Sequence, residues 1–472
     1  MSGGLLIRNV EIEGRSGLDV RIAAGRVAEL GRRLRGSEDE VDGAGGALIP
    51  GLIDHHIHLL ALAAQADSVR LDTARDAGDL AARLAAATAA RPAGAWLRAT
   101  GYHEAVAGVL EAPDLDRLAP RHPLRIQHRS GALWTLNTLA LTRAIGNEPP
   151  PPCVETDAAG RPTGRIWRGD AWLSARIGRT LPPLAPVGRT LAACGITGVT
   201  DASATTDADT AARLAAAHHA GDLPQRLMLM SGGPFTPFSG VAAGPVKVLL
   251  DEADLPDLDT LIARIAEARG WRRRVAMHCA TAVELAFALA AFEAAGTEPG
   301  DRIEHGSVIP EAAVPVLATL RLSVVTQPGF VAERGDRYLA EVSAEDQAGL
   351  YRIASLKRAG VPVAASSDAP YSAPDPWAAM RAAVDRRTRL GFGLGPEEAV
   401  DPATALSLYL GGFARPGGRP RRVASGAAAD LCLLAVPLGE ALQALDPDLV
   451  AATLVAGRVV FDRRQESAAR AA

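Results

Sequence analysis

The feature that most constrains the fold is an alternation of short apolar, β-branched segments with longer Ala- and Leu-rich segments of helical period. This alternation is typical of βα units, whose strands form a parallel sheet. Eight segments have the composition of strands, which is the number that a closed (β/α)8 barrel needs. They are residues 47–58, 195–203, 225–232, 245–252, 274–280, 301–307, 321–328 and 361–370. Helices are expected between or after them, among others at residues 259–270, 282–296 and 375–391.

Two parts of the chain do not fit a bare barrel. The interval after the first strand is far longer than one crossover helix needs, which predicts an insertion at about residues 62–190 that acts as a lid over the barrel mouth. Both termini contain alternating strands with glycine turns. We therefore expect a small composite β-sandwich domain from residues 1–48 and 415–472, with the barrel in residues 49–414.

The composition limits which molecules the protein is expected to bind and where in the cell it is expected to be. The formal net charge is −4, and acidic and basic residues are both scattered along the chain. The chain therefore has no cluster of basic residues that could bind the phosphates of a nucleic acid, and nucleic acid is not an expected partner. No run of 18 apolar residues is present, and the four cysteines lack a CxxC pair. These features predict a cytoplasmic protein that acts on a small molecule and has no membrane segment; a homodimer is the default expectation.

Residues that bind metals fall at the ends of the predicted strands. In GLIDHHIHLL (51–60), His56 and His58 are two apart and point the same way from an extended segment. Other strands end in further candidates, which are Lys247, His278, His305 and Asp368. One such histidine is more often a hydrogen-bonded core residue, but barrel enzymes place their reacting groups at this end. The coincidence predicts a site for zinc or a similar divalent metal.

The same residues carry a family resemblance. PGLIDHHIH (50–58), Lys247, His278, EHG around His305 and SSDAPY around Asp368 follow the amidohydrolase superfamily in order. The chain resembles amidohydrolase family 3, which contains N-substituted formamide deformylases, through WLRATGYHE (96–104), GALWTLNTLAL (131–141), GRIWRGD (164–170) and ASSDAPYSAPDPW (365–377). The resemblance implies a metal-dependent barrel that carries a composite β-domain.

The resemblance also implies a role for each residue. His56 and His58 would hold one metal, and His278 and His305 would hold a second; the sequence leaves open whether one or two metals bind. Lys247, as a carbamate formed with CO2, would bridge the two metals, and Asp368 would bind metal and act as general acid and base for a metal-activated hydroxide. Arginine cannot replace such a lysine. Only two lysines occur in this arginine-rich chain, Lys247 and Lys357.

The substrate is less constrained than the metal site. Relatives often carry a histidine where this chain has Ala132. The candidate substrate-binding residues are Tyr102, His128, Trp134, Asn137, Gln327 and Tyr371, with Phe330 and Trp377 as further apolar walls. Such walls favour an N-acyl or N-formyl compound with a hydrophobic part.

Three other functions remain open at the level of sequence. A one-metal deaminase needs a glutamate shortly after the histidine of the fifth strand, but His278 precedes Cys-Ala-Thr and Glu284 lies a helical turn further on. The same metals also drive hydrolysis of esters or phosphorus centres. A non-catalytic binding protein is the third alternative, although every proposed ligand is present. The favoured interpretation is hydrolysis of a C–N bond other than a peptide bond.

Overall fold

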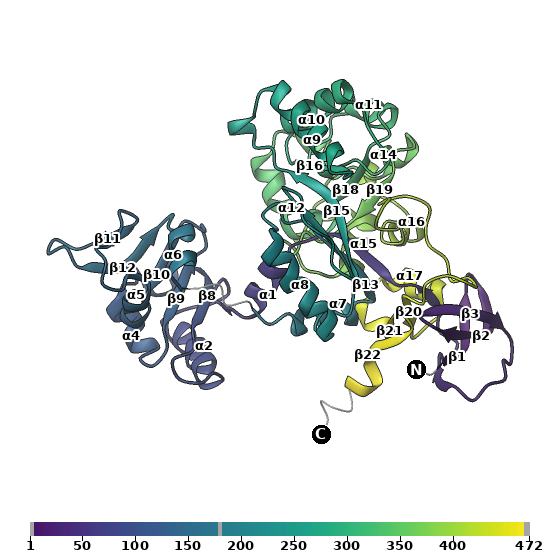
Figure 1. Ribbon diagram of the computed structural model, residues 1–472, viewed down its shortest axis with the longest axis horizontal. Coiled ribbons are helices and arrows are strands. Elements are labelled where there is room, and N and C mark those ends of the chain that lie inside the picture. Colours follow the sequence, from purple (N-terminus) through teal and green to yellow (C-terminus); the bar gives the residue numbers. More distant parts are fainter. Residues whose placement is uncertain (1–3, 178–181, 467–472) are drawn as a thin grey trace. The chain divides into compact units, whose positions relative to one another are not determined.

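The computed structural model describes residues 4–177 and 182–466. The chain divides into two compact units, one formed by Met1–Leu59 with Leu184–Ala472 and the other by Leu60–Pro183. The first contains the barrel and the strands from both termini, and the second is the insertion (Figure 1). Among the described residues, no helix is long and apolar enough to span a membrane.

The barrel sheet has eight strands, and every pair of hydrogen-bonded neighbours is parallel. The strands follow one another around the sheet in chain order, which confirms the predicted (β/α)8 fold. Each predicted segment contains all or part of one barrel strand, although segment 47–58 also contains β5 (Leu48–Pro50) of another sheet and β15 begins before residue 245. In chain order the barrel strands are β6 (Leu52–Ile57), β13 (Ile196–Asp201), β14 (Arg226–Ser231), β15 (Val241–Val248), β16 (Val275–Cys279), β17 (Arg302–His305), β18 (Ser323–Thr326) and β19 (Val363–Ala365).

The ends of β6 and β19 meet through backbone hydrogen bonds. The Asp368 N–H donates to the His56 carbonyl over 2.8 Å, and the His58 N–H donates to the Ala369 carbonyl over 2.8 Å. The buried Asp54 carboxylate strengthens the same seam, because it accepts hydrogen bonds from the Ser367 N–H at 3.1 Å and from the Ser367 hydroxyl. The first and last strands are therefore joined at their C-terminal ends, where the candidate metal ligands lie.

Helices separate most of the barrel strands, as the βα pattern predicts. They begin at N-caps such as Asp257 and Thr281, whose side chains accept hydrogen bonds from backbone N–H groups of the first turn. The helices of this unit are α7 (Ala185–Ala193), α8 (Ala208–Ala220), α9 (Leu258–Gly270), α10 (Ala282–Ala295), α11 (Ala313–Thr319), α12 (Gly329–Glu341), α13 (Ala344–Gln347), α14 (Ala354–Arg358), α15 (Pro376–Asp385), α16 (Pro402–Ser407) and α17 (Leu438–Ala444).

One predicted helix is shorter than expected. The segment 375–391 forms a helix only as far as Asp385, because Arg386 adopts a left-handed backbone conformation with φ 49°. The guanidinium of Arg386 is buried and donates hydrogen bonds to the carbonyls of Leu350, Tyr351 and Gly395. These contacts explain why the chain leaves the helix at this point.

Strands from both termini form two four-stranded sheets. One sheet has the order β3-β2-β1-β4 and the other β22-β21-β20-β5. Their shared core includes Ile7, Val20, Leu48, Leu433 and Leu454, so neither end of the chain can complete it alone. The strands are β1 (Leu5–Ile12), β2 (Arg15–Ala23), β3 (Arg26–Gly31), β4 (Asp39–Asp42), β5 (Leu48–Pro50), β20 (Leu431–Leu434), β21 (Val450–Val455) and β22 (Arg458–Asp462).

The insertion is a domain with a sheet of its own, in the order β11-β12-β10-β9-β8-β7. Two clusters of buried apolar side chains support this sheet, and the proline tract at 148–153 is a loop between α5 and β11. Its role as a lid stays a prediction. Its strands are β7 (Val69–Arg70), β8 (Leu97–Tyr102), β9 (Leu124–His128), β10 (Leu133–Leu136), β11 (Val154–Thr156) and β12 (Pro162–Trp167), and its helices are α1 (Leu59–Ala66), α2 (Ala77–Ala89), α3 (Glu104–Ala107), α4 (Ala112–Leu118), α5 (Thr138–Ile145) and α6 (Asp170–Ile177).

The shared core of the composite domain can be tested by truncating a leucine. Leu433 is 2% exposed in β20, so we expect Leu433→Ala to lower the free energy of unfolding by about 2–5 kcal/mol through lost burial and a residual cavity. Val459→Ala is the control, because Val459 is 40% exposed and should cost less than about 0.5 kcal/mol. Urea unfolding followed by circular dichroism measures both, and equal effects would contradict the assignment of Leu433 to this core.

Candidate metal centre

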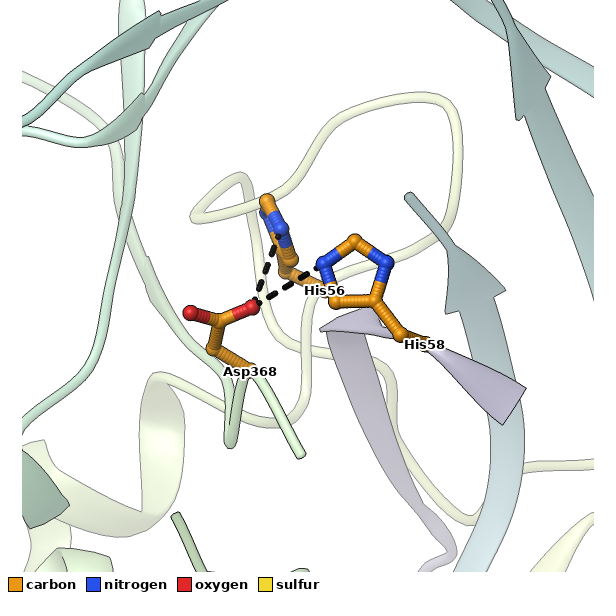
Figure 2. Close-up of side chains that lie close together, drawn as sticks. All are labelled: His56, His58 and Asp368. Carbon is orange, nitrogen blue, oxygen red and sulfur yellow. Dashed lines mark ion pairs between the residues drawn. The ribbon is translucent and has the colours of Figure 1, made fainter. Parts of the chain in front are cut away.

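His56, His58 and Asp368 form the centre of the candidate site (Figure 2). Oδ1 of Asp368 lies 3.4 Å from Nε2 of His56 and 3.2 Å from Nε2 of His58, so both rings point at the same carboxylate oxygen. One ligand atom from each of the three residues lies within 4.8 Å of the others. The side chain of His56 is fully buried, whereas that of His58 is 23% exposed. A single cation placed among these atoms would be reached by two imidazoles and a carboxylate.

The other predicted ligands surround this centre. The His305 ring lies 4.7 Å from that of His56 and 4.5 Å from that of His278 between centroids. Nδ1 of His305 is 3.9 Å from Oδ2 of Asp368. Lys247 comes from β15 and is 3% exposed. The structure therefore brings these residues to one end of the barrel, as the strand-end positions predicted.

Three side chains hold the imidazoles in one orientation. Nδ1 of His56 makes a hydrogen bond with the Glu304 carboxylate, and Nδ1 of His58 lies 3.1 Å from the Ser203 hydroxyl. Nδ1 of His305 lies 3.0 Å from Oε1 of Gln327. When the Nδ1 atoms donate these bonds, every Nε2 lone pair is left available for a metal, which is how protein metal sites fix their ligands.

The electrostatics favour the neutral form of three imidazoles, those of His56, His278 and His305. Burial lowers the pKa of His56 and His305 well below the ordinary value, and the nearby Lys247 amine lowers both further. Burial also lowers the pKa of His278. Because neutral imidazole is the form that binds a metal, these shifts favour a ligand set over a cluster of charged histidines.

Several buried polar atoms at the site have no hydrogen-bond partner among residues 4–177 and 182–466. They are Nζ of Lys247, Nε2 of His56 and Oδ1 of Asp368. Leaving buried polar groups unpaired is costly, so such a group of atoms is expected where a bound species completes the interactions. The residues present thus fit a divalent metal.

Two of the site residues adopt a backbone conformation that is uncommon for side-chain-bearing residues. His305 has φ 67° and Asp368 has φ 55°, both in the left-handed region. Such conformations persist where the surrounding structure fixes them and are concentrated at functional sites. The hydrogen bond from the Asp368 N–H to His56 is one of the contacts that fix it here.

The candidate substrate residues divide between the two units. Tyr371 is 58% exposed, and its ring lies 5.8 Å from that of His58, so it borders the metal site. Gln327 is buried and makes hydrogen bonds to His305 and Ser366, which gives it an orienting role. The expected walls Phe330 and Trp377 are 4% and 0% exposed, respectively, and their role as walls stays a prediction.

The other four candidates lie in the insertion. The amide of Asn137 accepts hydrogen bonds from two backbone N–H groups and donates to two carbonyls, so it holds the insertion together, and its role with a substrate stays a prediction. Trp134 and Tyr102 are each only 4% exposed, and their side chains pack in the two apolar clusters of the insertion. His128 lies 3.1 Å from Glu104 through Nε2, and its role with a substrate stays a prediction.

Sequence reasoning missed the orienting residues Glu304 and Ser203. Glu304 is fully buried and also pairs with Arg302, which is fully buried as well. The signal was present, because Glu304 immediately precedes His305 in the EHG motif. Side chains of adjacent strand residues diverge, so the pairing of Glu304 with His56 required the three-dimensional structure.

Comparison with known proteins agrees with this arrangement. The amidohydrolase family matches residues 39–461. This chain belongs to the amidohydrolase family. Among relatives of this amidohydrolase, the N-substituted formamide deformylase of Arthrobacter pascens is 26% identical over 482 residues, with 88% of each chain covered.

Solved structures of low identity share the amidohydrolase's fold. An uncharacterized metal-dependent hydrolase from Pyrococcus horikoshii OT3 superposes with a TM-score of 0.75 at 21% identity, covering 95% of this chain and 98% of its own. The N-isopropylammelide isopropylaminohydrolase of Burkholderia multivorans gives a TM-score of 0.54 at 18% identity, covering 98% and 99%. At these identities the likeness shows the fold.

The orienting role of Glu304 in this amidohydrolase can be tested by removing its charge. We expect Glu304→Gln to weaken metal binding by about 10–100-fold, because a neutral amide holds the His56 N–H less firmly and leaves Arg302 without its carboxylate. Competition with a chelator measures the dissociation constant. Glu311→Gln is the matched control at an exposed position. Equal metal affinity in the two variants would exclude the role.

Proposed function

We propose that this amidohydrolase is a metal-dependent hydrolase that cleaves the C–N bond of an amide, N-formyl or N-acyl compound. The observation that carries the proposal is the convergence of His56 and His58 on one buried oxygen of Asp368. The choice of a C–N bond is supported by the name of the relative from Arthrobacter pascens, an N-substituted formamide deformylase.

The residues divide into two candidate ligand groups. His56, His58 and Asp368 would hold one divalent metal, for which zinc is the natural choice with imidazole and carboxylate ligands. His278 and His305, whose rings lie 4.5 Å apart, would hold a second. A bound divalent metal at this position polarises a carbonyl and lowers the pKa of water.

We infer that Asp368 would move the proton during hydrolysis. Its carboxylate is 6% exposed, and one oxygen faces the ring nitrogens of His56 and His58. In the reaction, the oxygen of water adds to the carbonyl carbon and the C–N bond breaks. Asp368 would accept the proton of the attacking water and pass it to the leaving nitrogen, so that a carboxylate and an amine are released.

Lys247 is suited to carbamate formation. Burial lowers the pKa of its amine to about 8, so an appreciable fraction is neutral near physiological pH. The nitrogen of the neutral amine would bond to the carbon of CO2 and release one proton, which converts a neutral group into an anion; starting from the ammonium form, two protons are released. That anion would match the electrostatic needs of two cations better than the ammonium group would.

The deaminase alternative is disfavoured by the contacts of Glu284. Its carboxylate accepts hydrogen bonds from the backbone N–H groups of Ala280, Thr281 and Glu252 and completes the capping box of α10. Both carboxylate oxygens of Glu284 are therefore occupied by backbone N–H groups. A deaminase of this fold needs that acid at the reacting centre.

The proton-transfer role predicts a large kinetic effect at Asp368. We expect Asp368→Asn to lower kcat by about 10²–10⁴-fold against a panel of N-formyl and N-acyl amines, because an amide cannot accept the proton. Metal content is measured on the same sample, since Asp368 is also a proposed ligand. Asp385→Asn, at an exposed helix end, is the control. Undiminished kcat in Asp368→Asn would refute the role.

The carbamate predicts a difference between the chain's two lysines. We expect Lys247→Arg to lose activity and to lose the ¹³C carbamate signal seen after incubation with labelled bicarbonate, because a guanidinium cannot be carboxylated. Lys357→Arg should keep both, since Lys357 is exposed in α14. A carbamate signal that survives Lys247→Arg would place the modification elsewhere.

A further inference from the structure

A cavity of about 760 Å³ lies at the opposite end of the barrel from the metal site. Its wall includes Ile53 of β6, Leu227 of β14 and Val241 of β15, all in the N-terminal parts of their strands, and Leu431 of β20 in the composite domain. The metal-site residues His56 and Lys247 lie in the C-terminal parts of β6 and β15. The volume is within the range of small-molecule sites in proteins.

Most of the wall is apolar. Besides the strand residues, it contains Phe413, whose ring lies against Gly198 of β13. A Cβ atom at position 198 would come within 2.6 Å of Cζ of Phe413, so the glycine is needed for the ring to lie there. A ligand in this cavity would therefore contact hydrocarbon on several sides.

The charged groups of the wall do not balance. Arg226 pairs with Asp430 at 3.2 Å, and Asp430 also accepts a hydrogen bond from the backbone N–H of Ala456 at 2.7 Å. Arg422 pairs with Glu13. Arg421 has no carboxylate within ion-pair distance among the described residues, and Asp430, which interacts with it electrostatically, already pairs with Arg226.

The contacts of Arg421 leave part of its guanidinium available. Nε donates to the Leu410 carbonyl over 3.2 Å, and Nη2 donates to the Gly51 carbonyl. Nη1 makes no hydrogen bond within the described part of the chain. Burial lowers the pKa of Arg421 to about 10, but the group remains charged at neutral pH. Because Asp430 is shared with Arg226, a bound anion would add the negative charge that this partly buried cation does not have to itself.

We propose that this cavity binds a small organic anion, a monocarboxylate with an apolar body, whose carboxylate pairs with Arg421 while its hydrocarbon part occupies the wall formed by Ile53, Leu227, Val241 and Phe413. The site is separate from the metal centre and does not depend on the proposed hydrolysis. It combines the two properties that such a ligand needs, which are a guanidinium that forms no ion pair among the described residues and an apolar wall.

Titration calorimetry on the full-length, metal-loaded protein tests the site, with octanoate, 1-octanol and acetate as probes. Octanoate has both the charge and the apolar body, octanol lacks the charge, and acetate lacks the body. We expect one octanoate per chain, bound at least about tenfold more tightly than either of the other probes.

Two variants locate the bound anion. Arg421→Gln should weaken octanoate binding at least about tenfold and leave octanol binding unchanged, because only the charge is lost. Ala242→Phe adds a ring at an exposed position of the wall in β15 and should abolish octanoate binding. Ala242 lies outside the metal site, so hydrolytic activity and metal content should be unchanged in this variant.

Three results would overturn the proposal. Octanoate that fails to bind saturably would show that the cavity takes no such ligand. Equal affinity for octanoate and octanol would show that Arg421 contributes no charge recognition. Octanoate affinity that is unchanged in Ala242→Phe would place the anion elsewhere, for example at the metal centre. If Arg421→Gln fails to fold, the Ala242→Phe comparison alone decides.

Discussion

The site depends on the hydrogen bonds that join the first barrel strand to the segment after the last. The N–H of Asp368 donates to the His56 carbonyl, and the N–H of His58 donates to the Ala369 carbonyl. These bonds bring together residues more than 300 positions apart in the chain. The Asp54 carboxylate, which accepts bonds from Ser367, holds the same seam, and burial raises the pKa of Asp54 to about 6. Barrel closure and assembly of the ligand group are thus one structural event.

Around that seam, buried polar side chains orient the imidazoles. Glu304, Ser203 and Gln327 each contact the Nδ1 atom of one ring. The resulting convergence of unpaired Nε2 and carboxylate atoms would be costly in a site that stays empty of ligands. These unsatisfied polar groups indicate a bound species at the metal site.

The sequence predicts the parts that follow from periodicity. The eight strands, their order and the strand-end position of His56, Lys247, His278 and Asp368 all follow from local pattern, because β-strand period fixes which way a side chain points. Partners of a side chain do not follow from local pattern. Asn137 was expected to bind substrate, yet its amide is used entirely by backbone groups of the insertion. Glu304 was overlooked because its partner lies 248 residues away.

The central claim is that His56, His58 and Asp368 bind a metal, and anomalous diffraction tests it most directly. X-ray fluorescence of crystals of freshly purified protein identifies the element, and data collected at its absorption edge locate the ion. We expect an anomalous peak within ligand distance of Nε2 of His56 and His58 and of the Asp368 carboxylate. Absence of a peak there, or a peak only at the histidine and glutamate group of the insertion (His103, Glu104 and His128), would contradict the claim.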